Sequence, residues 1–476
     1  MEFLDQLKAD LTTLGGSLRA LRYTTHIAKN PTRVFPQLIE ELAEKYGDAP
    51  ALLSDRENLS YRELGARSNR YARWALAQGV AKGDTVCLLM PNRPEFLAIW
   101  IGITRVGGVV ALLNTNLIGK ALAHCINVVA PRHIVVDADM LPPLQSAQPH
   151  LTSNARIWLH GDAVAELPRI DREVDALSGD ALADGERRAL TIEDRALFIY
   201  TSGTTGLPKA ANINHYRLML ATHAFAAVMN TRASDRMYDC LPLYHTSGGV
   251  LATGALLLKG GSVAIRERFS AREFWDDVVR FECTLLQYIG EFCRYLVNSP
   301  PHPKEHKHKL RLACGNGLRP DVWGEFKQRF RIPQIIEFYA ATEGNVTIFN
   351  WDGKEGAVGR VPWFLAHRFP IKVVRYDVEQ QQPVRTADGR LIKVGKGEVG
   401  LLIGEVSERY AFDGYTDKSA SEKKLLRDVF VAGDCWFNSG DLLRDLGFRH
   451  AQFVDRVGDT FRWKGENVST NEVAEV

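Results

Sequence analysis

Hydrophobic and polar positions alternate with two different periods along the chain, which predicts helices interleaved with strands. After Ser60, apolar residues recur at three-to-four spacing up to Gly79, and Glu63 completes a capping box, so we expect a helix there. Short apolar runs predict strands at residues 84–90, 109–113 and 133–137, with a helix at 93–107 between the first two. Strands that alternate with helices are typical of a parallel, doubly wound sheet.

The same alternation resumes after a polar, weakly periodic stretch at residues 150–190. Ser270 and Glu273 form a second capping-box pattern ahead of a helical segment. Strands are expected at residues 195–202, 210–214, 262–267, 284–290, 310–315 and 334–340, and helices at 291–299 and 321–330. Loops that follow consecutive strands of a parallel sheet lie at its carboxyl edge, where ligands bind.

From about residue 356 to 450, short apolar segments are separated by Gly, Asp and Pro, which favours a β-rich module. The expected fold class is therefore α/β, with two doubly wound α/β subdomains and a β-rich, barrel-like module. A chain of 476 residues is long enough for several such units.

The N-terminal segment carries an apolar stripe at helical spacing, which Gly15 and Gly16 are expected to break. The stripe consists of Phe3, Leu4, Leu7, Leu11, Leu14, Leu18 and Leu21. We expect it to pack against the chain's own domain, and contact with a membrane surface is the alternative. The most apolar segment, residues 96–113, is interrupted by Thr104, Arg105 and two glycines, so we interpret it as helix, turn and strand, not as a membrane span.

Composition narrows the class of protein. A hydrophobic fraction of 45% and a charged fraction of 24% are typical of soluble globular proteins. The formal net charge of +2 is too small to indicate a nucleic-acid partner. Seven scattered cysteines without a CxxC pair suggest neither a disulfide framework nor a zinc site, and they indicate a cytoplasmic protein.

The stretch "TSGTTGLPK" at residues 201–209 combines hydroxyls, glycines and a lysine between two predicted strands. Gly203, Gly206 and Lys209 lie three apart and Pro208 precedes the lysine, which does not match the P-loop of kinases and GTPases. A hairpin loop with this composition could bind phosphate oxygens, although a solvated turn is the alternative. The phosphate-binding candidates are Thr201, Ser202, Gly203, Thr204, Thr205, Gly206 and Lys209.

This loop resembles the phosphate loop of the adenylate-forming superfamily, and three later strings follow in the family's order. They are "YAATEG" at 339–344, similar to the adenine and magnesium motif, "NSGDLL" at 438–443, similar to the ribose motif, and "DRVGDTFRWKGENVS" at 455–469, similar to the hinge. The strings "LYHTSGG", "GNGLRPDVWGEF" and "FDGYTDKSASEKK" resemble the fatty acid transport protein and very-long-chain acyl-CoA synthetase branch, in which bacterial long-chain acyl-CoA synthetases fit best.

The resemblance implies a domain organisation. Residues 1–34 would be an amphipathic leader, 35–454 the AMP-binding N-terminal domain, and 455–476 the hinge and the start of a truncated C-terminal domain. The C-terminal α+β domain of relatives would be almost entirely absent from this chain.

The resemblance also implies a nucleotide site, and the chemistry of its residues is suitable. One carboxylate, Asp441, can accept hydrogen bonds from both hydroxyls of a ribose, although an Asp that follows Ser439 and Gly440 can also serve a turn. Tyr339 can stack on adenine or pack in the core. The remaining expected contacts are Gly315, Asn316 and Gly317 at the purine edge, Ala340 and Thr342 in the adenine motif, and Arg456 at the ribose or phosphates.

The implied reaction has two steps. A fatty carboxylate attacks ATP to give acyl-AMP and pyrophosphate, and the thiol of coenzyme A then displaces AMP. Mg²⁺ bound to Glu343 would neutralise phosphate charge, although an isolated "TEG" acid is more often in a loop or at a helix start. The catalytic candidates are Lys209, Thr342, Glu343 and His245, of which His245 is expected near the acyl carboxylate.

Two departures from the family pattern concern the end of the chain. Gly458 stands where many relatives have an acid, which leaves Asp455 or Gly458 as the pivot of the hinge. The lysine that contacts the reacting carboxylate in relatives lies beyond Val476, and Lys464 in the hinge is only a candidate for the CoA step. We therefore expect this chain to bind ATP but to turn over poorly, and its natural gene product to be longer.

Three functions remain open from the sequence. The first is a long-chain or very-long-chain fatty acyl-CoA ligase that acts on fatty acid, ATP and CoA in the cytoplasm. The second is an uptake protein that is peripheral on the inner face of a membrane. The third is an adenylating ligase for a bile acid, an aromatic acid or a carrier-protein-linked acyl group. Chain-length preference and oligomeric state are not specified by these motifs.

Overall fold

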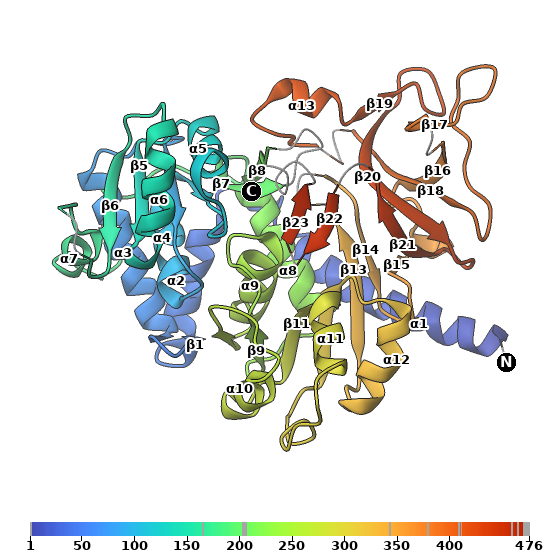
Figure 1. Cartoon of the computed structure of the whole chain (residues 1–476), viewed down its shortest axis with the longest axis horizontal. Helices are drawn as coiled ribbons and strands as arrows, with labels where there is room; N and C mark the ends of the chain where they lie inside the picture. Colours follow the sequence, from blue (N-terminus) through green and yellow to red (C-terminus); the bar gives the residue numbers. More distant parts are fainter. Residues whose placement is uncertain are drawn as a thin grey trace.

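The computed structural model describes residues 2–163, 166–201, 207–341, 344–377, 380–407, 410, 412–457, 460–463 and 466–469. Within these ranges the chain forms three sheets of more than two strands, and helices surround the first two sheets (Figure 1). Side chains are described within these ranges from residue 6 to residue 457. The mixed α/β class and the additional β-rich module agree with the sequence prediction.

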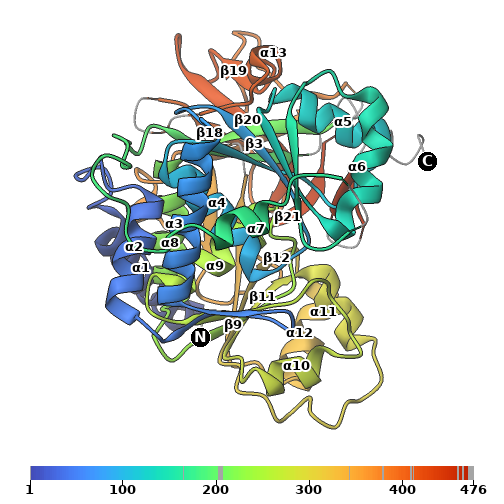
Figure 2. The ribbon, with the colours of Figure 1, turned by 90° about the vertical axis from the view of Figure 1, so that its left-hand side faces the viewer.

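The first sheet has the strand order β6-β5-β3-β4-β7-β8, parallel except for the final β7–β8 hairpin. Its strands are β3 (Thr85–Leu89), β4 (Val109–Leu112), β5 (His133–Asp137), β6 (Arg156–His160), β7 (Arg195–Thr201) and β8 (Lys209–Asn214). The helices that accompany it are α2 (Phe35–Tyr46), α3 (Tyr61–Ala77), α4 (Pro94–Arg105), α5 (Gly119–Val128), α6 (Leu141–Ala147) and α7 (Ile170–Asp175), with 3₁₀ turns η1 (Ala138–Met140) and η2 (Gln148–His150). In Figure 2, α3 and α4 lie on one side of this sheet and α5 and α6 on the other.

Alternation along the strands explains the two layers of helices. In β3, Val86 and Leu88 pack into the core shared with α3 and α4, whereas Cys87 and Leu89 pack into the core shared with α5 and α6. The capping box predicted at the start of α3 is confirmed, because Ser60 accepts from the Glu63 backbone and Glu63 accepts from that of Ser60.

The second sheet has the order β14-β13-β12-β11-β9-β10-β1-β2, and its central strands run parallel. Its strands are β1 (Pro50–Leu53), β2 (Asn58–Ser60), β9 (Arg236–Asp239), β10 (Ser262–Ile265), β11 (Leu285–Ile289), β12 (Leu312–Asn316), β13 (Ile335–Ala340) and β14 (Thr347–Asn350). The associated helices are α8 (His215–Val228), the π-helix η3 (Ser247–Ala252), α9 (Thr253–Leu257), α10 (Phe274–Arg280), α11 (Gly290–Val297) and α12 (Pro320–Arg329). The largest core cluster joins both sheets, since it contains side chains from α3 and α4 together with Leu285 and Leu312.

The third sheet is antiparallel and includes the β-rich segment predicted from residue 356 onward. Its strands are β15 (Gly359–Arg360), β16 (Ile371–Asp377), β17 (Gln382–Pro383), β18 (Val399–Glu405), β19 (Leu425–Arg427), β20 (Cys435–Asp445) and β21 (His450–Arg456), with η4 (Trp363–Leu365) and α13 (Lys418–Glu422) between them. A separate hairpin of β22 (Thr460–Trp463) and β23 (Glu466–Ser469) follows.

Two local predictions need correction. The stretch at residues 150–190 contains the edge strand β6, whose Trp158 is fully buried. This strand was not predicted from the sequence because the stretch as a whole is polar. The second capping box is only half formed. The Glu273 backbone donates to Ser270 at 3.3 Å, but α10 begins at Phe274 and Glu273 is its uncapped N-cap.

The N-terminal stripe also differs from its prediction. α1 (Glu2–Thr24) is one continuous helix, so Gly15 and Gly16 do not break it. It packs along α8 through its opposite face, where Thr13 and Ser17 are buried. Leu7, Leu11, Leu14 and Leu18 are exposed. The expectation that this stripe packs against the chain's own domain is therefore wrong for these four leucines.

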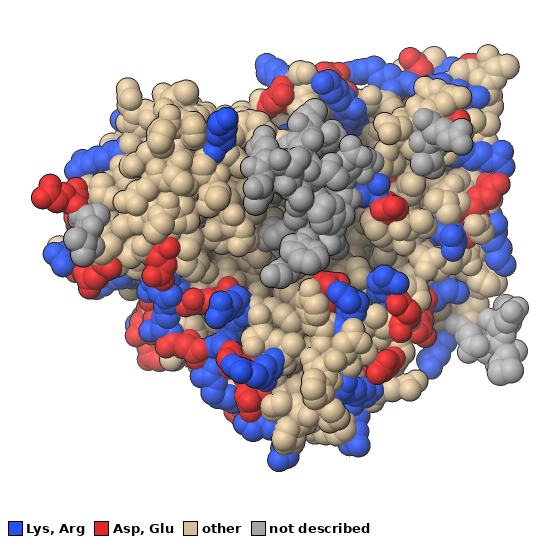
Figure 3. Space-filling view, in the orientation of Figure 1, with Lys and Arg blue, Asp and Glu red and all other residues tan. Residues whose placement is uncertain are grey.

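Positive and negative side chains are mixed on the surface, as the small net charge suggests. Figure 3 shows Lys and Arg interspersed with Asp and Glu on the face drawn there. Within the portion of the chain that the structure describes, no helix combines the length and the apolar character needed to cross a bilayer.

Candidate nucleotide site

The β7–β8 hairpin frames the predicted phosphate loop. Thr201 at the end of β7 is paired in register with Lys209 at the start of β8, as a hairpin requires. The Oγ1 atom of Thr201 is buried and has no hydrogen-bond partner among the described residues. Ser202, Gly203, Thr204, Thr205 and Gly206 lie outside the described residues. The hairpin prediction is confirmed, and the role of its tip stays a prediction.

The loop after β12 lies close to the start of α11. Gly317 has a φ of +78°, and a Cβ atom at Gly290 would lie 1.7 Å from its carbonyl oxygen. A Cβ at Gly315 would lie 2.2 Å from the carbonyl oxygen of Tyr288. Only glycines allow this approach of backbone to backbone. Packing within the chain therefore explains these glycines, and their contact with the purine edge stays a prediction.

Glu337 on β13 holds the same loop. Its fully buried carboxylate accepts from the Leu318 backbone N–H at 3.0 Å and from the Tyr288 hydroxyl. Asn316 ends β12, and its Oδ1 atom is buried without a partner in the described part of the chain. Sequence reasoning missed Glu337, although a lone acid inside the apolar run "QIIEFYA" was a detectable signal.

The residues predicted for adenine and ribose converge at one point. The Tyr339 hydroxyl donates to Asp441 Oδ2 at 2.5 Å, and Arg456 Nε lies 3.2 Å from Asp441 Oδ1. Asp441 and Arg456 face each other in register on β20 and β21. Burial raises the pKa of Tyr339 well above its usual value, and the Asp441 carboxylate raises it further, so the phenol stays a neutral donor.

The ribose candidate is not a turn residue. Asp441 lies within β20 and is only 5% exposed. The strand has a bulge just before it, where Gly440 has a φ of +76° and Asn438 accepts from the Gly440 backbone at 2.9 Å. Ser439 accepts from the Asp441 backbone and donates to the Leu402 carbonyl. The chain therefore holds the Asp441 carboxylate in a fixed orientation. Tyr339 is also buried, while Ala340 beside it is exposed.

The hinge residues continue directly from this site. The Val457 backbone donates to the Gly440 carbonyl at 2.7 Å, which fixes the start of the hinge string beside Asp441. Asp455 is exposed on β21, paired in register with Leu442. Gly458 and Lys464 lie outside the described residues, so their roles stay predictions.

Arg217 on α8 joins segments that the sequence reasoning treated separately. Its guanidinium donates to the Gly344 carbonyl at 2.9 Å and lies 3.5 Å from the Asp413 carboxylate. Gly344 directly follows Thr342 and Glu343, both of which lie outside the described residues. Arg217 was missed because nothing in the local string "NHYRLML" marks it as a site residue.

The profile of the AMP-binding enzyme family matches residues 39–402. This chain belongs to that family. Rat long-chain fatty acid transport protein 2 is 41% identical over 454 residues, which cover 94% of this chain and 73% of the relative. The medium/long-chain-fatty-acid–CoA ligase FadD6 of Mycobacterium tuberculosis is 39% identical over 437 residues, with coverages of 92% and 71%. The chain thus lies in the fatty acid transport protein and very-long-chain acyl-CoA synthetase branch.

Solved structures show the same fold. The anthranilate CoA ligase AuaEII in complex with anthranoyl-AMP superposes with a TM-score of 0.75 at 20% identity, covering 92% of this chain and 81% of that one. The long-chain-fatty-acid-CoA ligase FadD1 from Archaeoglobus fulgidus gives a TM-score of 0.74 at 18% identity, with coverages of 90% and 85%. The sequence prediction of an adenylate-forming fold is confirmed.

His245 lies in this AMP-binding enzyme between β9 and η3. Its backbone N–H donates to the Pro242 carbonyl at 3.1 Å, and its ring lies 4.7 Å from that of Tyr244. A Cβ at Gly249 would lie 1.9 Å from the carbonyl oxygen of Leu243, so the π-helix packs directly on the segment that carries His245. Its expected position near the acyl carboxylate stays a prediction.

Histidines 302, 306 and 308 have structural partners. His306 Nε2 and His308 Nε2 each lie 2.8 Å from a backbone carbonyl, those of Arg329 and Phe330. No group of three or more metal-ligating side chains occurs in the described ranges, here or elsewhere.

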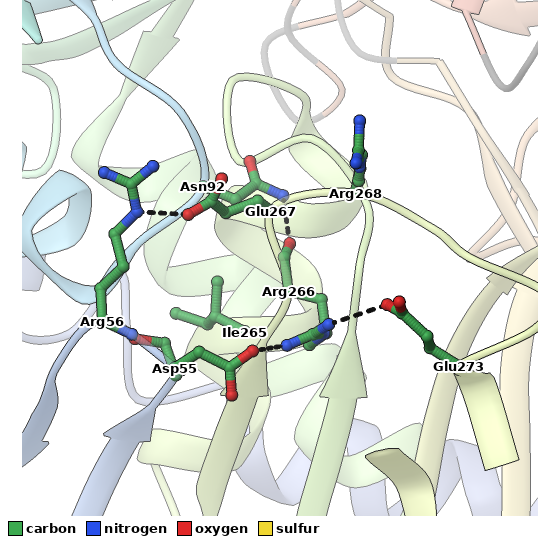
Figure 4. Close-up of a pocket in the computed structure, with 9 residues that line it drawn as sticks. Asp55, Arg56, Asn92, Ile265, Arg266, Glu267, Arg268 and Glu273 are labelled. Carbon is green, nitrogen blue, oxygen red and sulfur yellow. Dashed lines mark hydrogen bonds and ion pairs between the residues drawn. The ribbon is translucent and has the colours of Figure 1, made fainter. Parts of the chain in front are cut away.

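A polar cavity of about 230 Å³ lies apart from these residues, at the carboxyl end of β10 (Figure 4). Two of its arginines pair with acids of the same lining. Arg56 binds Glu267, and Arg266 binds Asp55 and Glu273. Arg56 also binds Asp139 next to the first sheet, at 2.8 Å. These ion pairs connect the two α/β subdomains. None of the predicted site residues lines the cavity.

Proposed function

We propose that this chain is an AMP-forming fatty acid–CoA ligase for long-chain or very-long-chain acids. The observation that carries the proposal is the convergence of Tyr339, Asp441 and Arg456 at the carboxyl edge of the second sheet. Membership of the AMP-binding enzyme family and of its fatty-acid branch supports it. Bile acids, aromatic acids and carrier-linked acyl groups are the alternative substrates.

The first step forms an acyl adenylate. A carboxylate oxygen of the fatty acid attacks the α-phosphorus of ATP, and the bond to the bridging oxygen breaks so that pyrophosphate leaves. Asp441 accepts hydrogen bonds from the ribose hydroxyls, and Arg456 and Lys209 neutralise phosphate charge. The hydroxyls and backbone N–H groups of residues 201–206 bind the phosphate oxygens, and Thr342 and His245 complete the site.

Magnesium fits this arrangement. Mg²⁺ is commonly held by one or two carboxylates together with substrate phosphates, so a single acid, Glu343, is a sufficient protein ligand. Arg217 anchors the Gly344 carbonyl next to that acid. When bound, the ion would stabilise negative charge on the leaving pyrophosphate.

The second step forms the thioester. The sulfur of coenzyme A loses its proton and attacks the acyl carbonyl carbon, and AMP leaves with the electrons of the carbon–oxygen bond. We propose residues 35–454 as the adenylating domain and 455–476 as the hinge region, with Asp455 or Gly458 as the pivot and Lys464 as a candidate for the CoA step.

The test is thioester formation across a panel of carboxylates with ATP, Mg²⁺ and CoA. Palmitate and longer acids should give acyl-CoA in preference to cholate and benzoate. Lys209→Ala should reduce the rate at least tenfold, whereas Lys327→Ala on the exposed side of α12 should not. A preference for benzoate or cholate would overturn the substrate class, and ATP cleavage to ADP would overturn the reaction.

We also propose that the enzyme is cytoplasmic and contacts the inner face of a membrane through α1. The exposed fractions of Leu11 and Leu18 are 61% and 57%, and exposed Lys8 and Arg22 flank the stripe. An apolar stripe bordered by cations is suited to lie at an anionic lipid surface. This contact would deliver a fatty acid from the bilayer to the ligase site.

A second segment with exposed aromatic residues is joined to α1. Arg360 pairs with Asp10 on α1 and donates to the Phe448 carbonyl at 3.2 Å. Phe448 is exposed, and Trp363, three residues after Arg360, is 73% exposed. Tryptophan is favoured at the interface between lipid and water, so these residues complement the leucine stripe.

Co-sedimentation with vesicles tests the membrane contact. The chain should bind vesicles of phosphatidylcholine with 30% phosphatidylserine, and Leu11→Asp with Leu18→Asp should abolish binding. Ile118→Asp is the matched control, because Ile118 is equally exposed but lies beside α5. Equal binding by both variants would overturn the α1 contact without affecting the ligase proposal.

A further inference from the structure

A short segment of the β-rich region adds to the edge of the phosphate hairpin. The Asn212 backbone on β8 donates to the Gly414 carbonyl, and the Thr416 backbone donates to the Ala210 carbonyl, both at 3.1 Å. Ala211 and Tyr415 form an antiparallel bridge between these bonds. Residues 414–416 therefore act as a third strand beside the β7–β8 hairpin.

Tyr415 is held tightly between two elements. It is 5% exposed and packs in a small cluster with Ala211 of β8 and Ala420 of α13. Its backbone N–H donates to Ser421 Oγ at 2.9 Å. The alanines leave room for the ring, and the hydrogen bonds fix the backbone that carries it.

The ring of Tyr415 faces the lysine predicted to bind phosphate. Lys209 Nζ lies 5.5 Å from the centroid of the Tyr415 ring, within the range of a cation–π interaction. A lysine side chain has about 2 kcal/mol of rotamer entropy, so a partner that restricts it lowers the cost of binding. An aromatic face restricts the lysine side chain without neutralising its positive charge.

A second set of contacts connects the end of β8 to the segment that carries Tyr415. Asn214 caps α8 by accepting from the Arg217 backbone at 2.9 Å, and the Arg217 guanidinium lies 3.5 Å from Asp413. Asn212 Nδ2 donates to the Asp413 carbonyl at 3.2 Å. The segment that carries Tyr415 is therefore fixed to the hairpin on both sides of the ring.

We propose that Tyr415 is a positioning residue that orients the Lys209 ammonium for the phosphates of ATP. This inference rests on the proposed function, because it assigns Lys209 to phosphate. Since Tyr415 and Asp441 belong to the same β-rich region, the region would contribute to both ends of the nucleotide, the ribose through Asp441 and the phosphates through Tyr415.

A double-mutant cycle on ATP binding tests the proposal. Tyr415→Leu should weaken the Kd for Mg-ATP, measured calorimetrically on the whole chain, about three- to tenfold. Tyr415→Phe, which keeps the aromatic face, should stay within about twofold of the wild type. Tyr415→Leu should add no further loss to Lys209→Ala, because the lysine through which it acts is already absent.

Tyr376→Leu is the control for general damage to the β-rich region, since Tyr376 is a half-buried tyrosine on β16. It should leave the Kd unchanged, and thermal melting of every variant separates unfolding from positioning. The proposal is overturned if Tyr415→Leu binds ATP like the wild type, or if its loss is fully additive with that of Lys209→Ala. If the wild type itself does not bind ATP, the proposed function fails instead.

Discussion

Tyr339 donates its phenolic proton to Asp441, although the two residues are 102 positions apart in the sequence. One is the penultimate residue of a strand of the second α/β sheet, and the other lies in the antiparallel sheet. The bond therefore joins the two regions at the point where a nucleotide is expected. It also fixes the carboxylate before any ligand arrives, so that binding does not have to order it.

Replacing Asp441 by Ala should weaken ATP binding at least tenfold, because it removes the acceptor of the ribose hydroxyls and leaves Arg456 without its carboxylate. Titration calorimetry with Mg-ATP measures the effect. Asp388→Ala in an exposed turn is the control and should bind normally. Tight binding by Asp441→Ala would exclude Asp441 as the ribose ligand.

Tyr339→Phe should lower the free energy of unfolding by about 1–3 kcal/mol, because a buried carboxylate loses a hydrogen bond. The aromatic face stays in place, so ATP affinity should change less than in Asp441→Ala. Urea denaturation and calorimetry on the same protein give both quantities. A variant with unchanged stability but no ATP binding would instead indicate direct contact between the hydroxyl and the nucleotide.

Gly290→Ala should lower stability by about 1–3 kcal/mol and weaken ATP binding, because the new Cβ would lie 1.7 Å from the Gly317 carbonyl oxygen. Gly324→Ala within α12 is the matched control. Its Cβ would approach only the end of the Glu355 side chain, at 3.3 Å, and alanine favours the helix. Urea denaturation should give opposite signs for the two variants, and equal effects would refute the loop packing.

Neighbouring glycines in α1 offer a similar comparison. A Cβ at Gly15 meets nothing within 4 Å, so Gly15→Ala should stabilise the chain by about 0.5–1 kcal/mol. A Cβ at Gly16 would lie 2.8 Å from the Trp351 ring, so Gly16→Ala should destabilise it. If thermal melting shifts both variants in the same direction, α1 does not pack on Trp351 as described.

His160 should make stability depend on alkaline pH. It lies 3.6 Å from both Glu95 and Asp137. Burial alone would lower its pKa, but these carboxylates raise it to about 9. Its contribution is therefore complete below its unfolded pKa of about 6.5, and up to about 3 kcal/mol is lost as the pH rises through 9. Denaturation of the wild type and of His160→Gln at pH 6 and pH 9.5 should show this loss in the wild type alone.

Much of the fold was predictable from local patterns. The capping box of α3, the strands β3, β4, β5, β7 and β8 of the first sheet and the β7–β8 hairpin all follow from periodicity and turn residues near one another in the sequence. Pairing over long distances was not predictable. β1 and β2 precede the whole first sheet but join the second, because β1 pairs with β10 more than 200 positions later.

Some residues of the site were likewise predictable from local sequence, and others were not. Motifs identified Lys209, Tyr339, Asp441 and Arg456, since each belongs to a recognisable string. Glu337 and Arg217 act by holding loops from other parts of the chain, and local sequence does not reveal such roles. The exposed stripe of α1 was misread because helical spacing is the same whether the apolar face meets the core or the surface.

The most direct test is detection of the acyl adenylate. The chain is incubated with ATP, Mg²⁺ and palmitate without CoA, and palmitoyl-AMP and pyrophosphate are quantified by mass spectrometry. Because the chain is expected to turn over poorly, we predict that palmitoyl-AMP accumulates slowly to at most one per protein molecule for the wild type, and that none forms with Asp441→Ala. Absence of palmitoyl-AMP from a folded wild type that cleaves ATP to ADP would contradict acyl adenylation.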